Sequence, residues 1–220
     1  MGLNESKGNM YEWVTHTWNA IKGACPHDCS YCYMKRWGKL NPPRLDEKEL
    51  KTNLGSGNTI FVGSSFDMFT KDIPYEWVIK MLDHCSKFDN TYLFQSKNPK
   101  LFNVIYACEI EKFVLCTTIE TNRVYPEIMR NCPNPVDRAI EFGRILIEQK
   151  YVTIEPIIDF DLNSLVSMIR ICKPLQVNIG ADSGNNGLPE PESGKIHELI
   201  EALDAFTVVK QKKNLKRLLT

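Results

Sequence analysis

Short, nearly continuous runs of apolar residues alternate along the chain with longer segments of helical character. The apolar runs do not alternate with polar residues, which is typical of parallel strands that are covered on both faces. The predicted strands are residues 17–21, 59–62, 91–95, 113–118, 151–154, 176–179 and 207–209. The predicted helices are residues 46–54, 74–85, 136–149, 162–172, 194–203 and 210–219.

The alternation of strands and helices indicates a parallel sheet built from right-handed βαβ units. Six or seven such units fit in 220 residues, whereas a complete barrel of eight units usually needs about 250. We therefore expect an α/β fold, namely an incomplete (β/α) barrel with six or seven parallel strands, rather than an open doubly wound sheet. No linker or low-complexity stretch divides the chain, so one domain is predicted for residues 1–220.

Composition narrows the class of protein further. Hydrophobic residues make up 43% of the chain and charged residues 25%, as in ordinary soluble globular proteins. No apolar run approaches the roughly 18 residues of a spanning helix, so no membrane association is expected. The polar N-terminal sequence lacks the apolar stretch of a signal peptide, and a cytoplasmic location is predicted. Lys and Arg (27) balance Asp and Glu (27), so nucleic-acid binding would need a local patch.

Three of the eight cysteines, Cys25, Cys29 and Cys32, fall within eight residues. In a reducing compartment, clustered thiols indicate metal binding or catalysis rather than disulfides. Their C-x3-C-x2-C spacing, interrupted by Pro26 and Asp28, allows three thiolates to meet at one inorganic centre. The remaining five cysteines are scattered, and the default expectation for each is a small buried apolar side chain.

Two kinds of centre suit these three cysteines. A structural zinc site usually takes four ligands, and His27 is the candidate for the fourth, but the spacing lacks the paired knuckles of common zinc folds. A 4Fe-4S cluster normally takes four cysteines. Held by three, it keeps one iron open to a ligand that can be activated there.

The cysteine loop follows the first predicted strand and carries an aromatic residue, Tyr31, just before its last cysteine. In these features, and in its length, the chain resembles the radical SAM superfamily. The resemblance implies a 4Fe-4S cluster on Cys25, Cys29 and Cys32, whose open iron chelates the amino and carboxylate groups of S-adenosylmethionine (SAM). It also implies an enzyme that uses an external electron donor. Reductive cleavage of SAM then yields a 5′-deoxyadenosyl radical, which abstracts hydrogen from a substrate.

Other segments resemble particular branches of that superfamily. Residues 18–19, 61–69, 96–99, 154–156 and 180–184 are similar to a phage-associated group without assigned function. That group often has a longer gap between its first two cysteines, and the superfamily often has a Gly-Gly-Glu-like segment where this chain has Gly63-Ser64-Ser65. Residues 29–33 are similar to the spore photoproduct lyase branch, which repairs thymine lesions in DNA. These branches imply a nucleotide or a nucleic-acid base as the substrate.

The candidates for cofactor binding lie at the carboxyl ends of the predicted strands, which carry the active site in (β/α) barrels. Backbone and hydroxyl groups of Gly63, Ser64 and Ser65 are expected to hold the ammonium group of SAM, with Asp67 as a weaker candidate. By resemblance, polar groups after the fourth strand contact the ribose hydroxyls or the methionine carboxylate. The sixth strand ends in an inward-facing asparagine and in a glycine that permits close approach. The remaining cofactor candidates are Tyr31, Thr118, Glu120, Asn178 and Gly180.

Three further residues are candidates for catalysis. Glu155 follows an apolar strand, where a carboxylate is costly to bury unless it is paired. Lys97 is expected to pair with Glu155 across the barrel mouth or to hold an anionic substrate, with a solvated loop lysine as the alternative. Cys116 is placed either to return a hydrogen atom to the product or to be a buried structural thiol.

The expectations about partners rest on aromatic and basic residues. Five aromatic residues are expected to shield the cluster from water and oxygen, namely Trp13, Trp18, Tyr31, Tyr33 and Trp37. The basic run from Lys210 to Arg217 is either a solvated helix face or a contact for DNA phosphates. Because the net charge is zero, a small or single-nucleotide substrate is favoured over duplex DNA. The alternative to an enzyme is a zinc- or iron–sulfur-bearing protein that binds nucleic acid or senses redox state without SAM chemistry.

Overall fold

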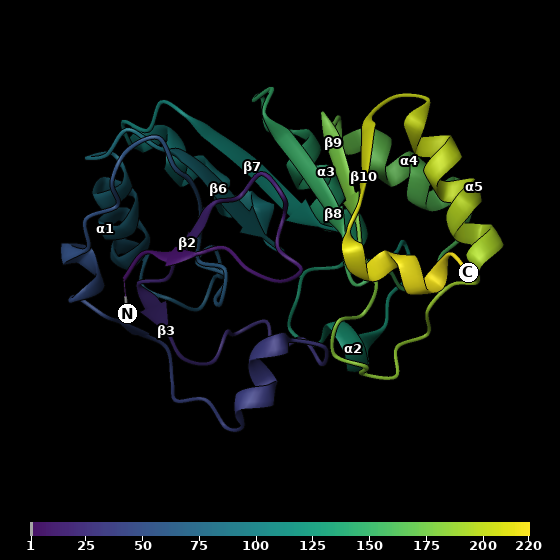
Figure 1. Cartoon of the computed structure of the whole chain (residues 1–220), viewed down its shortest axis with the longest axis horizontal. Helices are drawn as coiled ribbons and strands as arrows, with labels where there is room; N and C mark the ends of the chain where they lie inside the picture. The colour runs from purple at the N-terminus through teal and green to yellow at the C-terminus, as the bar shows by residue number, and fades with distance from the viewer. Residues whose placement is uncertain (1) are drawn as a thin grey trace.

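The computed structural model describes residues 2–220, and its central feature is a sheet of eight strands (Figure 1). Seven of these strands run parallel, and β1 at one edge is antiparallel to its neighbour β2. The order across the sheet is β1 (Asn4–Glu5), β2 (His16–Trp18), β5 (Thr59–Val62), β6 (Thr91–Ser96), β7 (Phe113–Thr118), β8 (Lys150–Ile154), β9 (Gln176–Ile179) and β10 (Val208–Gln211). A separate pair is formed by β3 (Ile21–Lys22) and β4 (Arg44–Leu45). The predicted α/β class with a mainly parallel sheet is confirmed.

The main helices pack against one face of this sheet and share a single hydrophobic core with it. Successive side chains of a strand point to opposite faces, and Ile60, Val62, Val152 and Ile154 are among those that face the helices. The helical elements of this layer are α1 (Tyr75–Cys85), the 3-10 helix η3 (Pro99–Ala107), α3 (Pro135–Gly143), α4 (Leu162–Cys172) and α5 (Ser193–Asp204).

The opposite face of the sheet is covered by residues 6–14, which lie between β1 and β2. Tyr11 and Val14 form a second buried cluster with strand residues Phe61, Leu93, Val114 and Cys116. In Figure 1 the purple N-terminal segment runs from β1 toward β8 and β10 before it turns back into β2. Its far end is fastened by Asn9, whose Nδ2 donates to Glu155 Oε1 over 2.8 Å. One face of the sheet thus carries the helices, and the other carries this segment.

Four predicted elements differ from those in the structure. The predicted strand 17–21 is divided between β2 and β3, because the chain leaves the main sheet at Asn19. The predicted helix 46–54 is reduced to the 3-10 turn η2 (Glu49–Lys51). Helix α3 ends at Gly143, where a side chain would meet Ile171 O of α4 at 2.6 Å. The predicted helix 210–219 begins instead as the last residues of β10 and continues as the 3-10 helix η4 (Lys213–Leu218).

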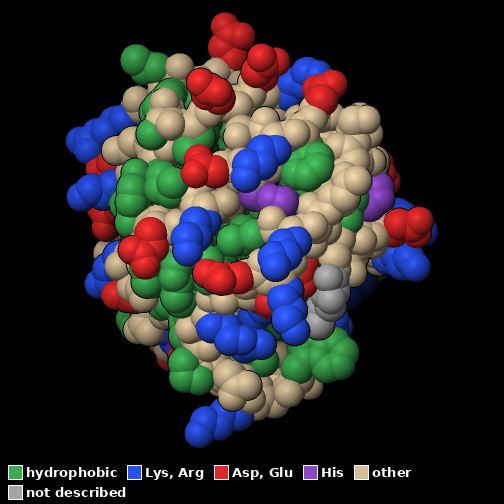
Figure 2. Space-filling view, turned by 90° about the vertical axis from the view of Figure 1, so that its left-hand side faces the viewer, with side chains coloured by type: hydrophobic (Ala, Val, Ile, Leu, Met, Phe, Trp, Pro, Cys, Tyr) green, Lys and Arg blue, Asp and Glu red, His purple; other side chains and the backbone are tan. Residues whose placement is uncertain are grey.

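The surface carries both signs of charge. On the face shown in Figure 2, Lys and Arg side chains are interspersed with Asp and Glu, as the zero net charge leads one to expect. Among residues 2–220, no helix is long and apolar enough to cross a membrane.

Candidate functional site

A cavity of about 510 Å³ opens at the carboxyl ends of the parallel strands. Its wall is made by the cysteine loop, by the loops after β5, β6, β8 and β9, and by the N-terminal segment. Eleven of the residues predicted to bind the metal centre or the cofactor or to act in catalysis line it, namely Cys25, Cys29, Tyr31, Cys32, Gly63, Ser64, Ser65, Asp67, Lys97, Thr118 and Glu155. Cys116, Glu120, Asn178 and Gly180 lie outside this wall.

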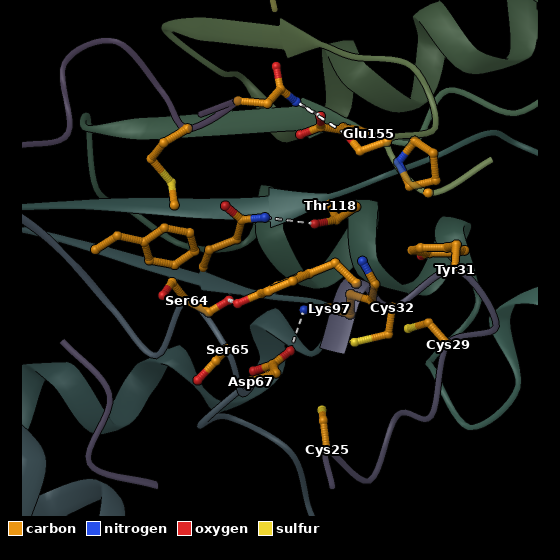
Figure 3. Close-up of a pocket in the computed structure, with 18 of the residues that line it drawn as sticks. Cys25, Cys29, Tyr31, Cys32, Ser64, Ser65, Asp67, Lys97, Thr118 and Glu155 are labelled. Carbon is orange, nitrogen blue, oxygen red and sulfur yellow. Dashed lines mark hydrogen bonds between the residues drawn. The ribbon is translucent and has the colours of Figure 1, made fainter. Parts of the chain in front are cut away.

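The cysteine loop folds as two successive tight turns. Asp28 N donates to Cys25 O over 3.0 Å, and Cys32 N donates to Cys29 O over 3.2 Å. Figure 3 shows the sulfur atoms of Cys25, Cys29 and Cys32 directed toward a common space beside Asp67. Burial raises the pKa of the Cys25 thiol to about 12. A hydrogen bond from Cys132 and the nearby Lys97 ammonium lower that of Cys29 to about 6.

The loop is tied to the sheet through His27 and Asp67. The Nε2 atom of His27 lies 2.9 Å from Asp67 Oδ2, and that oxygen also accepts hydrogen bonds from Ser96 Oγ and Lys97 N. Burial raises the pKa of Asp67, but His27 and the amide donors outweigh it and hold the pKa below its usual value. This contact engages the Nε2 atom of His27 and leaves Nδ1 without a part in it, so the alternative of His27 as a fourth zinc ligand stays a prediction.

A second tie runs from Tyr31 to Glu120. The Tyr31 hydroxyl donates to Glu120 Oε1, and Arg138 Nη1 donates to the other carboxylate oxygen over 2.6 Å. Lys97 Nζ lies 3.1 Å from Glu120 Oε1. Burial opposes ionisation, but Arg138 and Lys97 lower the pKa of Glu120 to about 2. Glu120 is thus a fully buried anion behind the cavity wall, not a residue that faces the cavity as its predicted role in cofactor binding requires.

The predicted pairing of Lys97 with Glu155 is wrong, because the structure gives each a different partner. Lys97 pairs with Glu120, while Glu155 Oε2 lies 2.5 Å from Lys212 Nζ. The other oxygen of Glu155 accepts hydrogen bonds from the side chains of Asn9 and Asn214. These three partners were not predicted, and the sequence held no signal for them, because they lie 57 to 146 residues from Glu155.

Gly180 lies against the side chain of Glu155 and does not line the cavity. A side chain at Gly180 would place its Cβ 2.6 Å from Glu155 Oε1. The absence of a side chain at Gly180 therefore makes room for the Glu155 carboxylate. Gly180 does permit a close approach, but the group that approaches is Glu155 and not a bound cofactor.

The Gly63-Ser64-Ser65 segment forms a turn directly after β5. Gly63 has φ of +77°, and a Cβ there would lie 2.8 Å from Phe66 O, so only glycine fits without strain. Asn19 holds the turn from the neighbouring strand: its Nδ2 donates to Ser64 Oγ over 3.1 Å, and its Oδ1 accepts from Ser65 N over 2.9 Å. Both serines line the cavity beside the cysteine loop (Figure 3).

The remaining candidates lie on the sheet face that the N-terminal segment covers. Thr118 lines the cavity and accepts a hydrogen bond from Gln95 Nε2 over 3.1 Å. Cys116 is 1% exposed and packs beneath Tyr11, and burial raises the pKa of its thiol to about 12. Asn178 is also buried, and its Nδ2 has no hydrogen-bond partner among the described residues.

The expectation that five aromatic side chains shield the cysteine loop is only partly met. Trp37 is 67% exposed and Tyr33 45%, and both stack with the Arg36 guanidinium. Trp18 is buried in the core on the helix side of the sheet. Tyr31 and Tyr33 both line the cavity, and Tyr31 is anchored to the buried Glu120.

The three thiols of the cysteine loop are free and face one cavity. A tetrahedral zinc site with Zn–S bonds of about 2.3 Å would bring its sulfurs within roughly 4 Å of one another. Among residues 2–220, no three Cys, His, Asp or Glu side chains converge in a way that would hold a single metal ion. Cys25, Cys29 and Cys32 are free thiols that open onto one cavity. This donor set, and the space in front of it, fit a 4Fe-4S cluster held by three thiolates.

Comparisons with known proteins bear on the fold. No protein-family model and no curated protein sequence matches the chain. A mutant of spore photoproduct lyase with bound AdoMet and dinucleoside spore photoproduct matches it with a TM-score of 0.57 at 11% identity, over 93% of this chain and 66% of that one. Spore photoproduct lyase complexed with dinucleoside spore photoproduct gives a TM-score of 0.57 at 10% identity, over 90% and 64%. The chain thus spans about two thirds of the lyase's length. Across that span it has the fold of spore photoproduct lyase.

Proposed function

We propose that the chain is a radical SAM enzyme, with a 4Fe-4S cluster on Cys25, Cys29 and Cys32. The observation that carries the proposal is that these three thiols open onto one cavity beside the Gly63-Ser64-Ser65 turn. The likeness in fold to a lyase structure with bound AdoMet supports it. The placement of all main helices on one sheet face supports the view of the sheet as an incomplete (β/α) barrel.

The residues of the chain have separate tasks in this proposal. The cluster and SAM, when bound, supply a 5′-deoxyadenosyl radical that abstracts hydrogen from the substrate. Ser64 and Ser65 offer hydroxyls to the ammonium group of SAM, and Thr118 offers a hydroxyl from β7. The buried Tyr31–Glu120 contact and the His27–Asp67 contact hold the cysteine loop in place. The N-terminal segment closes the cavity on one side and so limits the access of water to it.

We further propose a nucleotide or a single nucleic-acid base as the substrate class. The cavity of about 510 Å³ lies within the range typical of small-ligand sites. Lys7, Arg36 and Lys212 line it and offer cations for a phosphate group. Of these, Lys7 and Arg36 have no carboxylate partner among residues 2–220, whereas Lys212 is already paired with Glu155. The dinucleoside bound by the lyase of the same fold is consistent with this class.

Anaerobic reconstitution tests the proposal. With iron and sulfide, the purified protein is expected to take up about four irons and a brown colour, and then to release 5′-deoxyadenosine from SAM under a chemical reductant. Alanine at any one of Cys25, Cys29 and Cys32 should abolish both the colour and the product. Cys108→Ala, at a half-buried thiol outside the cavity, should change neither.

The same experiment separates the alternatives. Uptake of zinc in place of iron would support a structural metal protein. A stable iron–sulfur cluster without cleavage of SAM would support a redox sensor. Retention of iron and of SAM cleavage in the triple cysteine variant would contradict the site assignment altogether.

A further inference from the structure

One contact of the cysteine loop has no part in the proposed chemistry. Cys29 Sγ and Cys132 Sγ lie 3.3 Å apart, although 103 residues separate them in sequence. Within residues 2–220 they are the one pair of thiols in direct contact. A disulfide bond is about 2.05 Å long, so the two sulfurs need to approach by only about 1.3 Å. We propose that Cys29 and Cys132 form a reversible disulfide, and that this bond governs whether the loop can take up its cluster.

The two backbones that carry these thiols are already docked. Ser30 N donates to Ile128 O over 2.9 Å, and Asn131 N donates to His27 O over 3.2 Å. The side chain of Asn131 also donates to Pro26 O over 2.9 Å. Backbone contacts on both sides of the thiol pair therefore hold the two segments in register, and the disulfide can form without separating them.

Further contacts hold the chain on both sides of Cys132 in place. Arg138 Nε donates over 2.7 Å to the carbonyl oxygen of Pro133, the residue that follows Cys132. Arg130 pairs with Asp28 of the cysteine loop over 2.5 Å. Cys132 is half-buried, and Cys29 lines the cavity, so a small oxidant can reach the pair.

Hydrogen peroxide is a sufficient oxidant. The sulfur of Cys29, which lines the cavity, attacks one peroxide oxygen; the O–O bond breaks, and a sulfenic acid and hydroxide form. The sulfur of Cys132 then attacks that sulfur and expels a second hydroxide. The two hydroxides take up the two thiol protons, so one peroxide and two thiols give one disulfide and two waters. Each cysteine sulfur loses one electron, and the peroxide gains both.

The disulfide removes a cluster ligand. Metal binding by cysteine requires the thiolate, and a sulfur of Cys29 bonded to Cys132 cannot supply one. Exchange with a dithiol reductant restores both thiols. The effect of the disulfide on cluster uptake rests on the proposed function, because the bond can block uptake only if Cys29 is a ligand of the cluster.

Peptide mapping and cluster loading test the two halves separately. Apoprotein is treated with hydrogen peroxide, freed of the excess and digested with trypsin without reduction. The expected product joins residues 23–35 to residues 131–138 through Cys29 and Cys132. Loading from a preformed 4Fe-4S donor without added thiol, followed by absorbance and iron content, should be at least tenfold lower in oxidised than in dithiothreitol-reduced protein. Cys132→Ser should load equally in both states, and Cys108→Ser should stay sensitive.

Each outcome decides one point. A bond from Cys29 to Cys25 or Cys32 in place of Cys132, or equal loading of oxidised and reduced wild-type protein, overturns the proposed switch. If the joined peptides form but the reduced protein takes up no cluster, the disulfide is supported and the proposed function fails instead.

Discussion

Glu120 shows how one buried residue can fix the geometry of the cysteine loop. Its carboxylate is fully buried, and burying a charge is costly unless it is paired. Arg138 and Lys97 supply two cations, and the Tyr31 hydroxyl supplies a hydrogen bond from within the loop. The position of Tyr31, next to Cys32, therefore depends on an ion pair that lies behind the cavity wall.

The pKa of Glu120 predicts how this contribution changes with pH. The pKa is about 2 in the folded protein against an ordinary value of 4.5. The carboxylate therefore stabilises the fold fully above pH 4.5, and this contribution is lost as the pH falls from about 4.5 to about 2. Glu120→Gln should lower the free energy of unfolding at pH 7 by about 3–5 kcal/mol, the usual cost of breaking a buried pair.

Denaturant unfolding of both proteins across that pH range checks this expectation. The difference in free energy of unfolding between wild type and Glu120→Gln should shrink as the solution is acidified from pH 4.5 to pH 2. A difference that stays constant would mean that Glu120 is not held as an anion.

The serine turn gives a second prediction at this scale. Ser64 and Ser65 line the cavity, and leucine at both positions would fill space next to the cysteine loop. We expect Ser64→Leu, Ser65→Leu to weaken SAM binding at least tenfold while iron content stays unchanged. Equilibrium dialysis with labelled SAM measures the first quantity. Ser56→Leu, in an exposed loop outside the cavity, is the matched control, and unaltered SAM affinity in the double variant would remove the turn from the site.

Residue types at strand ends could be predicted from sequence, but their partners could not. The cysteine spacing and Gly63-Ser64-Ser65 stand out locally, and both line the cavity. Arg138 sits in the middle of an amphipathic helix, 18 residues from Glu120, and reads there as an ordinary surface residue. Only the packing of α3 against the sheet turns it inward. Ion pairs such as Arg138–Glu120 form between elements that only the tertiary fold brings together, and no local sequence pattern indicates them.

The secondary-structure elements supply their own core, independent of the cysteine loop. Buried side chains from the strands and the five main helical elements form one continuous cluster; of the loop thiols, only the partly buried Cys25 packs against it. The protein thus differs from small metal-dependent domains, in which binding of the metal is itself the folding energy.

We therefore expect the apoprotein to retain most of its far-UV circular dichroism and a cooperative thermal transition. Reconstitution with iron and sulfide should change the visible absorbance far more than the far-UV signal. Loss of cooperative unfolding in the absence of iron would contradict this and would favour a structural metal.

Strand positions were predictable because parallel strands are buried on both faces. Residues 113–118 and 176–179 are strands with the predicted bounds, and their apolar residues Val114, Leu115, Val177 and Ile179 are buried. The N-terminal segment was not predicted, because residues 6–14 carry no periodic pattern. Its position follows from Tyr11 and Val14, which bury their side chains against strands that come much later in the chain.

The charge distribution of the whole molecule bears on the substrate. In the C-terminal basic run, Lys212 is paired with Glu155 and Arg217 with Glu190. Among residues 210–217 as described here, only Lys210, Lys213 and Lys216 are basic and without a carboxylate partner. Two of the five cations are thus already neutralised within the fold.

Duplex DNA should accordingly bind weakly and with little dependence on salt. Three phosphate contacts would give a slope of log affinity against log salt no steeper than about −3. Fluorescence anisotropy of a labelled duplex over a salt series measures it. A much steeper slope that flattens in Lys213→Ala, Lys216→Ala would show duplex binding through this run and would contradict the preference for a small substrate.

The contact of Asn9 with residues near the C-terminus determines when the cavity wall can form during synthesis. Asn9 accepts a hydrogen bond from Asn214 N over 3.4 Å, across 205 residues of chain. The three thiols of the cysteine loop leave the ribosome early, but the cavity wall in front of them can close only after residue 214 has followed. For most of translation the cysteine loop is therefore open to the surrounding solution. In the proposed enzyme, a cluster would therefore meet an open loop while the chain is being made and a walled cavity once the chain is complete.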